Sequence, residues 1–267
     1  MQFAVDHDYH LHSNLSRCSR CPEQTPERIL QYAQENGLKT IVLTDHFWDC
    51  DVPSEKKFYE YQNFEHITQS LPLPQAEGIR FLFGCETDLD KDLTLGISRE
   101  RMEALDFIII PTTHFHMQFT LTDAQRQDVA GRISAWLRRL EGVLNMDLPF
   151  YKVGLAHLTC SLIHRDREEY LKVLAGLPED AMAALFQKAA RCGVGIELNA
   201  SDIRAATGAE EIVLRPYRIA KECGCKFYMG SDSHSPDGFL NTIERFEHAV
   251  TVLELTEDDK FIPRNQA

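Results

Sequence analysis

The segment 8–12, with the sequence Asp-Tyr-His-Leu-His, constrains the fold of this chain more than any other. It follows the apolar run 3–5, so we expect it in a β-strand. Residues i and i+2 of a strand point to the same face, and His10 and His12 therefore present two imidazoles side by side. Two neutral imidazoles near the carboxylate of Asp8 are typical of the first part of a transition-metal site. The remaining ligands of such a site have to come from other strands.

Short apolar runs alternate with amphipathic segments along the whole chain. After the first run, the predicted strands span residues 40–43, 79–83, 106–110, 153–156, 194–198 and 226–229. The predicted helices between them span residues 25–37, 54–70, 98–104, 122–142, 179–192 and 216–222. This alternation predicts an α/β fold with mostly parallel strands, and apolar runs buried on both faces favour a barrel. We expect residues 1–267 to form one domain.

Residue types that bind metals recur where the predicted strands end. They are Asp45 and His46, Glu86, His114 and His116, His157, and the pair Asp232 and His234. In α/β barrels the chemistry is found at the carboxyl ends of the strands, so all these side chains should meet at one mouth. Each residue alone has an ordinary alternative as a cap, turn or core residue, but together they predict a metal cluster. The spacing leaves open which of His114 and His116 faces it.

Composition excludes several classes of partner. Acidic residues outnumber basic ones 41 to 28, and the formal charge of −13 disfavours long nucleic acids and anionic membranes. There is no apolar run of membrane-spanning length and no segment resembling a secretion signal. Eight cysteines in such a chain favour a reducing cytoplasm over a disulfide framework. We expect a cytoplasmic protein with a small-molecule partner, and the sequence leaves its oligomeric state open.

Seven short motifs resemble, in order, those of the PHP (polymerase and histidinol phosphatase) superfamily. They are Asp8-Tyr9-His10-Leu11-His12-Ser13, Thr44-Asp45-His46, Gly84-Cys85-Glu86, Thr113-His114-Phe115, Gly154-Leu155-Ala156-His157, Ile196-Glu197-Leu198-Asn199 and Gly230-Ser231-Asp232-Ser233-His234. The resemblance runs from residue 6 to about residue 240. It implies a distorted (β/α)7 TIM-like barrel with two or three divalent ions, zinc, manganese or iron, at its C-terminal mouth. It also implies hydrolysis of phosphoric esters.

The resemblance carries the metal ligands of the family onto eight residues, with Glu86 as the bridging carboxylate. They are His10, His12, His46, Glu86, His114, His157, Asp232 and His234. One ligand departs from the family pattern, which has a histidine or aspartate five or six residues after the His-x-His. These places hold Arg17 and Cys18. Either Cys18 binds as a thiolate, or that metal is bound weakly or is absent.

Further roles follow from the resemblance and from the chemistry of phosphoryl transfer. The phosphate-binding arginine of the family corresponds to Arg204, while Arg17 and Arg20 beside the first motif are further candidates. Asp45 is expected to orient a ligand histidine. His116, if it is not a ligand, could protonate the leaving alkoxide.

The leading hypothesis is a phosphomonoesterase that hydrolyses a small phosphorylated metabolite, with L-histidinol phosphate as the named candidate, by a metal-activated bridging hydroxide. The alternative is a phosphodiesterase or exonuclease that acts on nucleotides or short oligonucleotides in the same site. An amidohydrolase-type barrel would need a bridging lysine at the fourth strand, and none lies near His114. A non-catalytic binding module would not account for the eight ligands.

Overall fold

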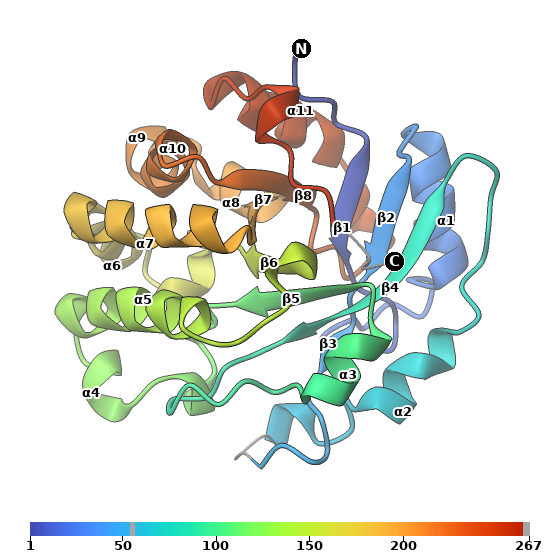
Figure 1. Ribbon diagram of the computed structural model, residues 1–267, viewed down its shortest axis with the longest axis horizontal. Coiled ribbons are helices and arrows are strands. Elements are labelled where there is room, and N and C mark those ends of the chain that lie inside the picture. The colour runs from blue at the N-terminus through green and yellow to red at the C-terminus, as the bar shows by residue number, and fades with distance from the viewer. Residues whose placement is uncertain (54–56, 264–267) are drawn as a thin grey trace.

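The computed structural model describes residues 1–53 and 57–263, with one sheet of eight strands at its centre and helices around it (Figure 1). The strands are β1 (His7–Leu11), β2 (Thr40–Leu43), β3 (His46–Phe47), β4 (Arg80–Thr87), β5 (Phe107–Pro111), β6 (Val153–Ala156), β7 (Gly195–Asn199) and β8 (Lys226–Gly230). All pairs are parallel, in the order β1-β2-β4-β5-β6-β7-β8, and the short β3 pairs with β4.

The sheet curves into a nearly closed barrel. The first half of β4 pairs with β2 and its second half with β5, so this long strand joins the two parts of the sheet. At the seam between β1 and β8, the Asp232 N–H donates to His10 O at 2.8 Å, and the Met229 N–H donates to His7 Nε2 at 3.1 Å. The Asp8 carboxylate accepts from the Ser231 N–H across the same seam. The predicted TIM-like α/β barrel is confirmed.

Aromatic rings fill the barrel interior below the mouth. Tyr9, Phe107, Tyr228 and Phe261 pack on one another with ring centroids 5.4–6.2 Å apart. Tyr228 needs the space beside Gly154, because a Cβ there would lie 2.4 Å from its hydroxyl oxygen. The packing of these rings makes this part of the barrel interior largely apolar, although the buried His7 ring lies 4.4 Å from that of Tyr9.

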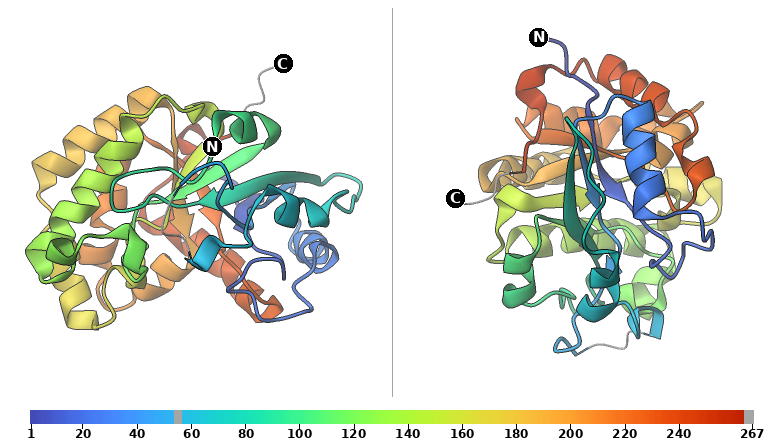
Figure 2. Two further views of the ribbon diagram at one scale, coloured as in Figure 1. Left: turned by 90° about the horizontal axis from the view of Figure 1, so that it is seen from below. Right: turned by 90° about the vertical axis from the view of Figure 1, so that its right-hand side faces the viewer.

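The helices form an outer layer, as the two turned views of Figure 2 show. The buried apolar side chains of most helices pack on the sheet in the main core, whereas those of the first helix form a second cluster with β1 and β2. The helices are α1 (Pro26–Glu35), α2 (Phe64–Ile67), α3 (Arg99–Ala104), α4 (Asp123–Arg126), α5 (Val129–Leu144), α6 (Arg167–Ala175), α7 (Glu179–Cys192), α8 (Ala200–Ala205), α9 (Glu210–Val213), α10 (Arg215–Glu222) and α11 (Thr242–Val252). Within the described ranges, none of these helices combines the length and apolar character needed to cross a bilayer.

Three predicted elements differ from those observed. The strand predicted at residues 79–83 continues to Thr87 in β4, so that Glu86 lies inside the strand. Of the predicted helix 54–70, residues 54–56 lie outside the described part, and the rest forms short turns and α2, which begins where the Asn63 side chain accepts from the His66 N–H. The helix predicted at 122–142 is divided into α4 and α5, because the Asp128 side chain caps a new helix start at the Gly131 N–H. Helices α6, α8, α9 and α11 were not predicted.

Candidate metal centre

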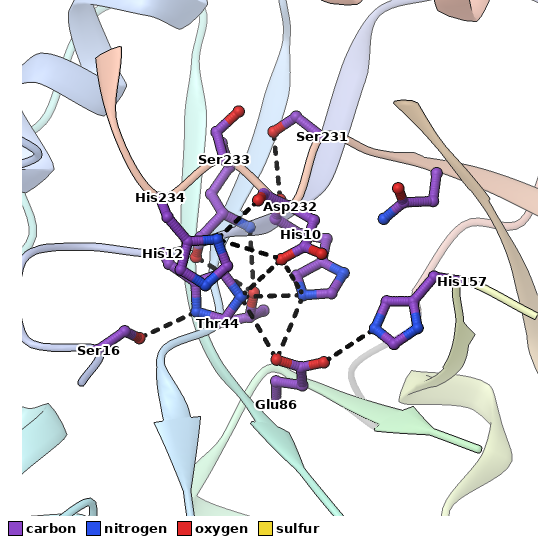
Figure 3. A network of polar contacts seen from close by, with 12 residues as sticks. His10, His12, Ser16, Thr44, Glu86, His157, Ser231, Asp232, Ser233 and His234 are labelled. Atoms are coloured by element: carbon purple, nitrogen blue, oxygen red, sulfur yellow. Dashed lines mark hydrogen bonds and ion pairs between the residues drawn. The ribbon is translucent and has the colours of Figure 1, made fainter. Parts of the chain in front are cut away.

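The structure brings the predicted ligand residues together at the C-terminal mouth of the barrel, and Figure 3 shows six of them, His10, His12, Glu86, His157, Asp232 and His234. Three groups of side chains have ligand atoms within 4.8 Å of one another and could each hold a metal ion. The groups are His10, His12 and Glu86; Glu86, His114 and His157; and His12, His46 and His234. The eighth predicted ligand, Asp232, joins the first group with Oδ1 3.2 Å from His12 Nε2. Between His114 and His116, it is His114 that lies in the cluster.

The first group combines two imidazoles and two carboxylates. His10 Nε2 and His12 Nε2 lie 3.1 Å apart, and both face Glu86 Oε2, at 3.6 and 3.4 Å. Asp232 Oδ1 lies 3.5 Å from His10 Nε2. The two histidines are fully buried, and Glu86 is 1% exposed, so water from the solvent cannot form hydrogen bonds with the two imidazoles or with the Glu86 carboxylate.

The opposite ring nitrogens show which atoms carry protons. His10 Nδ1 lies 2.7 Å from Glu197 Oε1, and a carboxylate only accepts, so this nitrogen donates. The Ser16 hydroxyl donates to Asp45 Oδ1 at 2.6 Å and therefore accepts from His12 Nδ1 at 2.9 Å. In the neutral rings, both Nε2 lone pairs then face each other at 3.1 Å. Lone pairs this close repel unless a cation lies between them, and this arrangement therefore fits a metal ion.

Glu86 connects the first group to the second. Its Oε1 lies 3.2 Å from His157 Nε2 and 3.8 Å from His114 Nε2. The other nitrogen of His114 contacts Asp88 Oδ2 at 2.8 Å, and His157 Nδ1 contacts Thr113 Oγ1 at 3.2 Å. One carboxylate thus presents one oxygen to each group, which is the geometry of a bridging ligand.

The third group lies beside the loop after β1. The His12 and His234 rings stack with centroids 4.0 Å apart, and His234 Nε2 is buried without a hydrogen-bond partner among the described residues. His46 Nδ1 lies 2.9 Å from Glu86 Oε2, and its Nε2 lies 3.1 Å from the sulfur of Cys18. Cys18 is therefore adjacent to this group.

The titratable groups at the mouth strongly change one another's pKa values. Burial raises the pKa of Glu86, but His46 and His10 outweigh this effect and hold it well below the usual value. Burial lowers the pKa of His10, but Glu197, Asp232 and Glu86 raise it well above the usual value. The buried carboxylates therefore demand positive charge, from protons on the imidazoles or from bound cations. Burial likewise raises the pKa of the Cys18 thiol, but His46 and His234 outweigh it and lower the value to about 6.

The predicted positioning residue Asp45 does not face the cluster. Its two oxygens accept from the Ser13 N–H at 2.8 Å, the Ser13 hydroxyl at 2.6 Å and the Ser16 hydroxyl. Among the described residues, Ser16 connects it to His12. His116 is exposed at the rim with its ring 5.3 Å from that of His114, and burial of part of the side chain and the neighbouring His114 lower its pKa to about 4.

The predicted phosphate-binding arginines lie in two places. Arg17 and Arg20 are exposed on the loop after β1. The Cζ atom of Arg17 lies over the Phe58 ring, 5.7 Å from the ring centroid. That ring packs against His46, so Arg17 is at the rim of the mouth. Arg204 is exposed on α8. The pKa of Arg245 on α11 is lowered mainly by burial and also by the charge of Arg204.

Sequence reasoning gave no role to Glu197, Asp88 or Ser16. Glu197 holds His10 through Oε1, and its Oε2 accepts from the His157 N–H at 2.6 Å. The available signal was a glutamate inside an apolar strand, since a buried carboxylate requires donors.

Comparisons with known proteins agree with this fold. The structure is similar to a crystal structure of histidinol phosphate phosphatase from Lactococcus lactis subsp. lactis, solved with zinc, L-histidinol and phosphate, with a TM-score of 0.66 at 16% identity over 96% of this chain and 98% of that one. It is also similar to a protein assigned as a histidinol phosphatase from Listeria monocytogenes, with a TM-score of 0.66 at 13% identity over 90% of this chain and 99% of the other. At such identities the similarity shows the fold. No curated protein matches the sequence.

The sequence itself matches the PHP domain over residues 8–201, well over half of the chain. This match confirms the family predicted from the motifs and, with it, the enzyme class, a metal-dependent hydrolase of phosphoric esters. The chain belongs to the PHP domain family.

Proposed function

We propose that this hydrolase is a phosphomonoesterase that acts on a small phosphorylated metabolite, with L-histidinol phosphate as the first substrate to test. The observation that carries the proposal is the pair of facing Nε2 atoms of His10 and His12, 3.1 Å apart among carboxylates. The structural neighbour solved with zinc, L-histidinol and phosphate supports the choice of substrate. The acidic balance of the chain supports a small substrate over a long nucleic acid.

Eight side chains would hold the divalent ions, which we propose to be zinc, manganese or iron. His10, His12, Asp232 and Glu86 form one position, and Glu86, His114 and His157 form a second. His46 and His234 are the ligands proposed for a third position. Imidazole and carboxylate ligands together suit these borderline metals.

When bound, divalent ions at these positions would activate a water and stabilise the charge that develops on the phosphoryl oxygens. Asp45 keeps His12 oriented through Ser16, and Glu197 does the same for His10. Arg17, Arg20 and Arg204 are the candidates for holding the phosphate, and Arg204 is also a catalytic candidate.

We propose His116, at the rim of the mouth, as the acid that protonates the leaving alkoxide; because its pKa is lowered to about 4, this role requires that the negative charge of the bound phosphate raise the pKa. All eight cysteines are free thiols, which supports a cytoplasmic protein. We also propose that residues 1–267 form a single domain.

The test is phosphate release from chelator-treated protein reloaded with Zn²⁺, Mn²⁺ or Fe²⁺. The substrates are L-histidinol phosphate, other small phosphomonoesters, a model phosphodiester and a short single-stranded oligonucleotide. Metal-dependent release from a phosphomonoester, lost in Glu86→Gln and retained in His248→Gln, supports the proposal, since His248 is an exposed residue of α11. Cleavage of only the diester or the oligonucleotide supports the phosphodiesterase alternative. No release from any substrate with any metal refutes both.

A further inference from the structure

The loop after β1 holds Cys18 rigidly at the rim of the mouth. On one side of it, the Arg17 N–H donates to Gln62 Oε1 at 2.7 Å. On the other side, the Ser19 hydroxyl donates to the backbone carbonyl of His234 at 2.7 Å. The second bond ties the loop directly to a residue of the third group. The position of the thiol is therefore fixed by contacts that do not involve the thiol.

The third group differs chemically from the other two. The first two groups share the oxygen ligand Glu86, whereas the third consists of imidazoles alone. His46 is 4% exposed, and its Nε2 faces the Cys18 sulfur at 3.1 Å. The ligand atoms of His46 and His234 lie within 4.8 Å of each other, and His234 Nε2 is buried without a hydrogen-bond partner in the described structure. Two imidazoles and one thiolate make a soft donor set that leaves a fourth tetrahedral position open.

We propose that Cys18 binds a third metal ion as a thiolate, together with His46 and His234, and that this position selects thiophilic ions such as Zn²⁺ or Co²⁺ over Mn²⁺. The inference rests on the proposed function for the neighbouring two positions. A thiolate binds Zn²⁺ at about 2.3 Å and favours it over the hard Mn²⁺, which prefers oxygen. The Glu86 positions accept Mn²⁺ as well as Zn²⁺. The enzyme would thus hold two kinds of metal position within one mouth.

The experiment is a titration of the metal-free protein with Co²⁺, because only sulfur ligands give the intense thiolate-to-cobalt charge-transfer band in the near ultraviolet. Cys18→Ser is the test variant. Cys21→Ser, in the same loop, and Cys50→Ser, on the exposed loop after β3, are the matched controls. We expect the band, and one more bound equivalent of metal, in the wild type and both controls and not in Cys18→Ser. With Mn²⁺, the wild type should bind no more ions than Cys18→Ser.

A second measurement on the wild type does not depend on how a variant folds. Zn²⁺ should slow alkylation of Cys18 by N-ethylmaleimide at least about tenfold, as metal ligation removes the free thiolate, and leave Cys50 labelling unchanged. Absence of the band at saturating Co²⁺, its full retention in Cys18→Ser, or equal labelling of Cys18 with and without Zn²⁺ overturns the inference. If two equivalents of metal still bind and phosphate is still released, the proposed function stands even though the inference about Cys18 is overturned. If no metal binds at all, the proposed function fails as well.

Discussion

Replacement of Glu197 by glutamine tests whether the proton positions at the mouth determine metal binding. Both oxygens of Glu197 accept from N–H donors, His10 Nδ1 at 2.7 Å and the His157 backbone at 2.6 Å. An amide has only one accepting oxygen. If that oxygen keeps the bond to the His157 N–H, the amide NH₂ faces His10 Nδ1 and forces the His10 proton onto Nε2. The atom that faces the metal position then carries a hydrogen and cannot bind a metal.

The expected magnitude follows from these two contacts. Each is a buried hydrogen bond to a charged group, worth about 1.5–3 kcal/mol. Loss of the partner that orients a ligand histidine typically weakens metal binding about 10–100-fold. This factor corresponds to about 1.4–2.7 kcal/mol of binding free energy. We therefore expect Glu197→Gln to bind the ion at the His10 position about 10–100-fold more weakly than the wild type.

The assay is competition for Zn²⁺ with a chromophoric chelator at neutral pH, with circular dichroism as the check of folding. Glu35→Gln, an exposed residue of α1, is the matched control and should bind as the wild type does. If folded Glu197→Gln retains every Zn²⁺ affinity to within about twofold, the argument that tautomers at the mouth govern binding is refuted.

Three further predictions concern stability. Removal of metal with a chelator should lower the Tm in calorimetry, since an ion at 1,000 times its Kd stabilises the fold by about 4 kcal/mol; an unchanged Tm would contradict metal binding. Gly230→Ala would place a Cβ 1.9 Å from Glu197 Oε1, so it should destabilise the protein by about 1–3 kcal/mol in urea unfolding and weaken metal binding. Burial lowers the pKa of His7 below 6.5, although Asp6 acts in the opposite direction. Neutral His7 therefore stabilises the barrel seam fully above pH 6.5, and this stabilisation is lost as the pH falls through the pKa of His7 in the folded protein. The stability of metal-loaded wild type should therefore fall more steeply below pH 6.5 than that of His7→Gln, and parallel curves would disprove this role of His7.

The barrel and most of the cluster could be predicted from the sequence because each signal was local. Period-2 geometry places His10 and His12 together, and the 3.1 Å between their Nε2 atoms agrees with this. The strand ends could be located to within a residue or two, except that β4 continues four residues past the predicted end at residue 83, and parallel strands bring their carboxyl ends together. Helix division at Asp128 was missed because a helical pattern does not show which polar residue will cap a new start.

The residues that orient the ligands could not be predicted, because their partners are distant in sequence. Glu197 acts on His10, 187 positions away, and no local pattern encodes such a pair. The carboxylate of Asp8 was interpreted as part of the first metal-site motif, but it accepts from the Ser231 N–H and the Tyr32 hydroxyl and holds the barrel seam. Alternation along a strand determines which face a side chain occupies, and the neighbouring strands determine which partner it finds.

The metal centre and the closure of the barrel depend on the same contacts. Glu197 on β7 binds the His10 ring on β1 and the His157 backbone after β6, so one carboxylate connects three strand ends. The backbone of Asp232, a proposed ligand after β8, donates to His10 O at the seam where the sheet closes. A buried acidic network of this kind is stable only when positive charge balances it, because uncompensated carboxylates in a low-dielectric site are costly. Bound metal would supply that charge where β1 meets β8, so loading of the site and closure of the sheet are expected to stabilise each other.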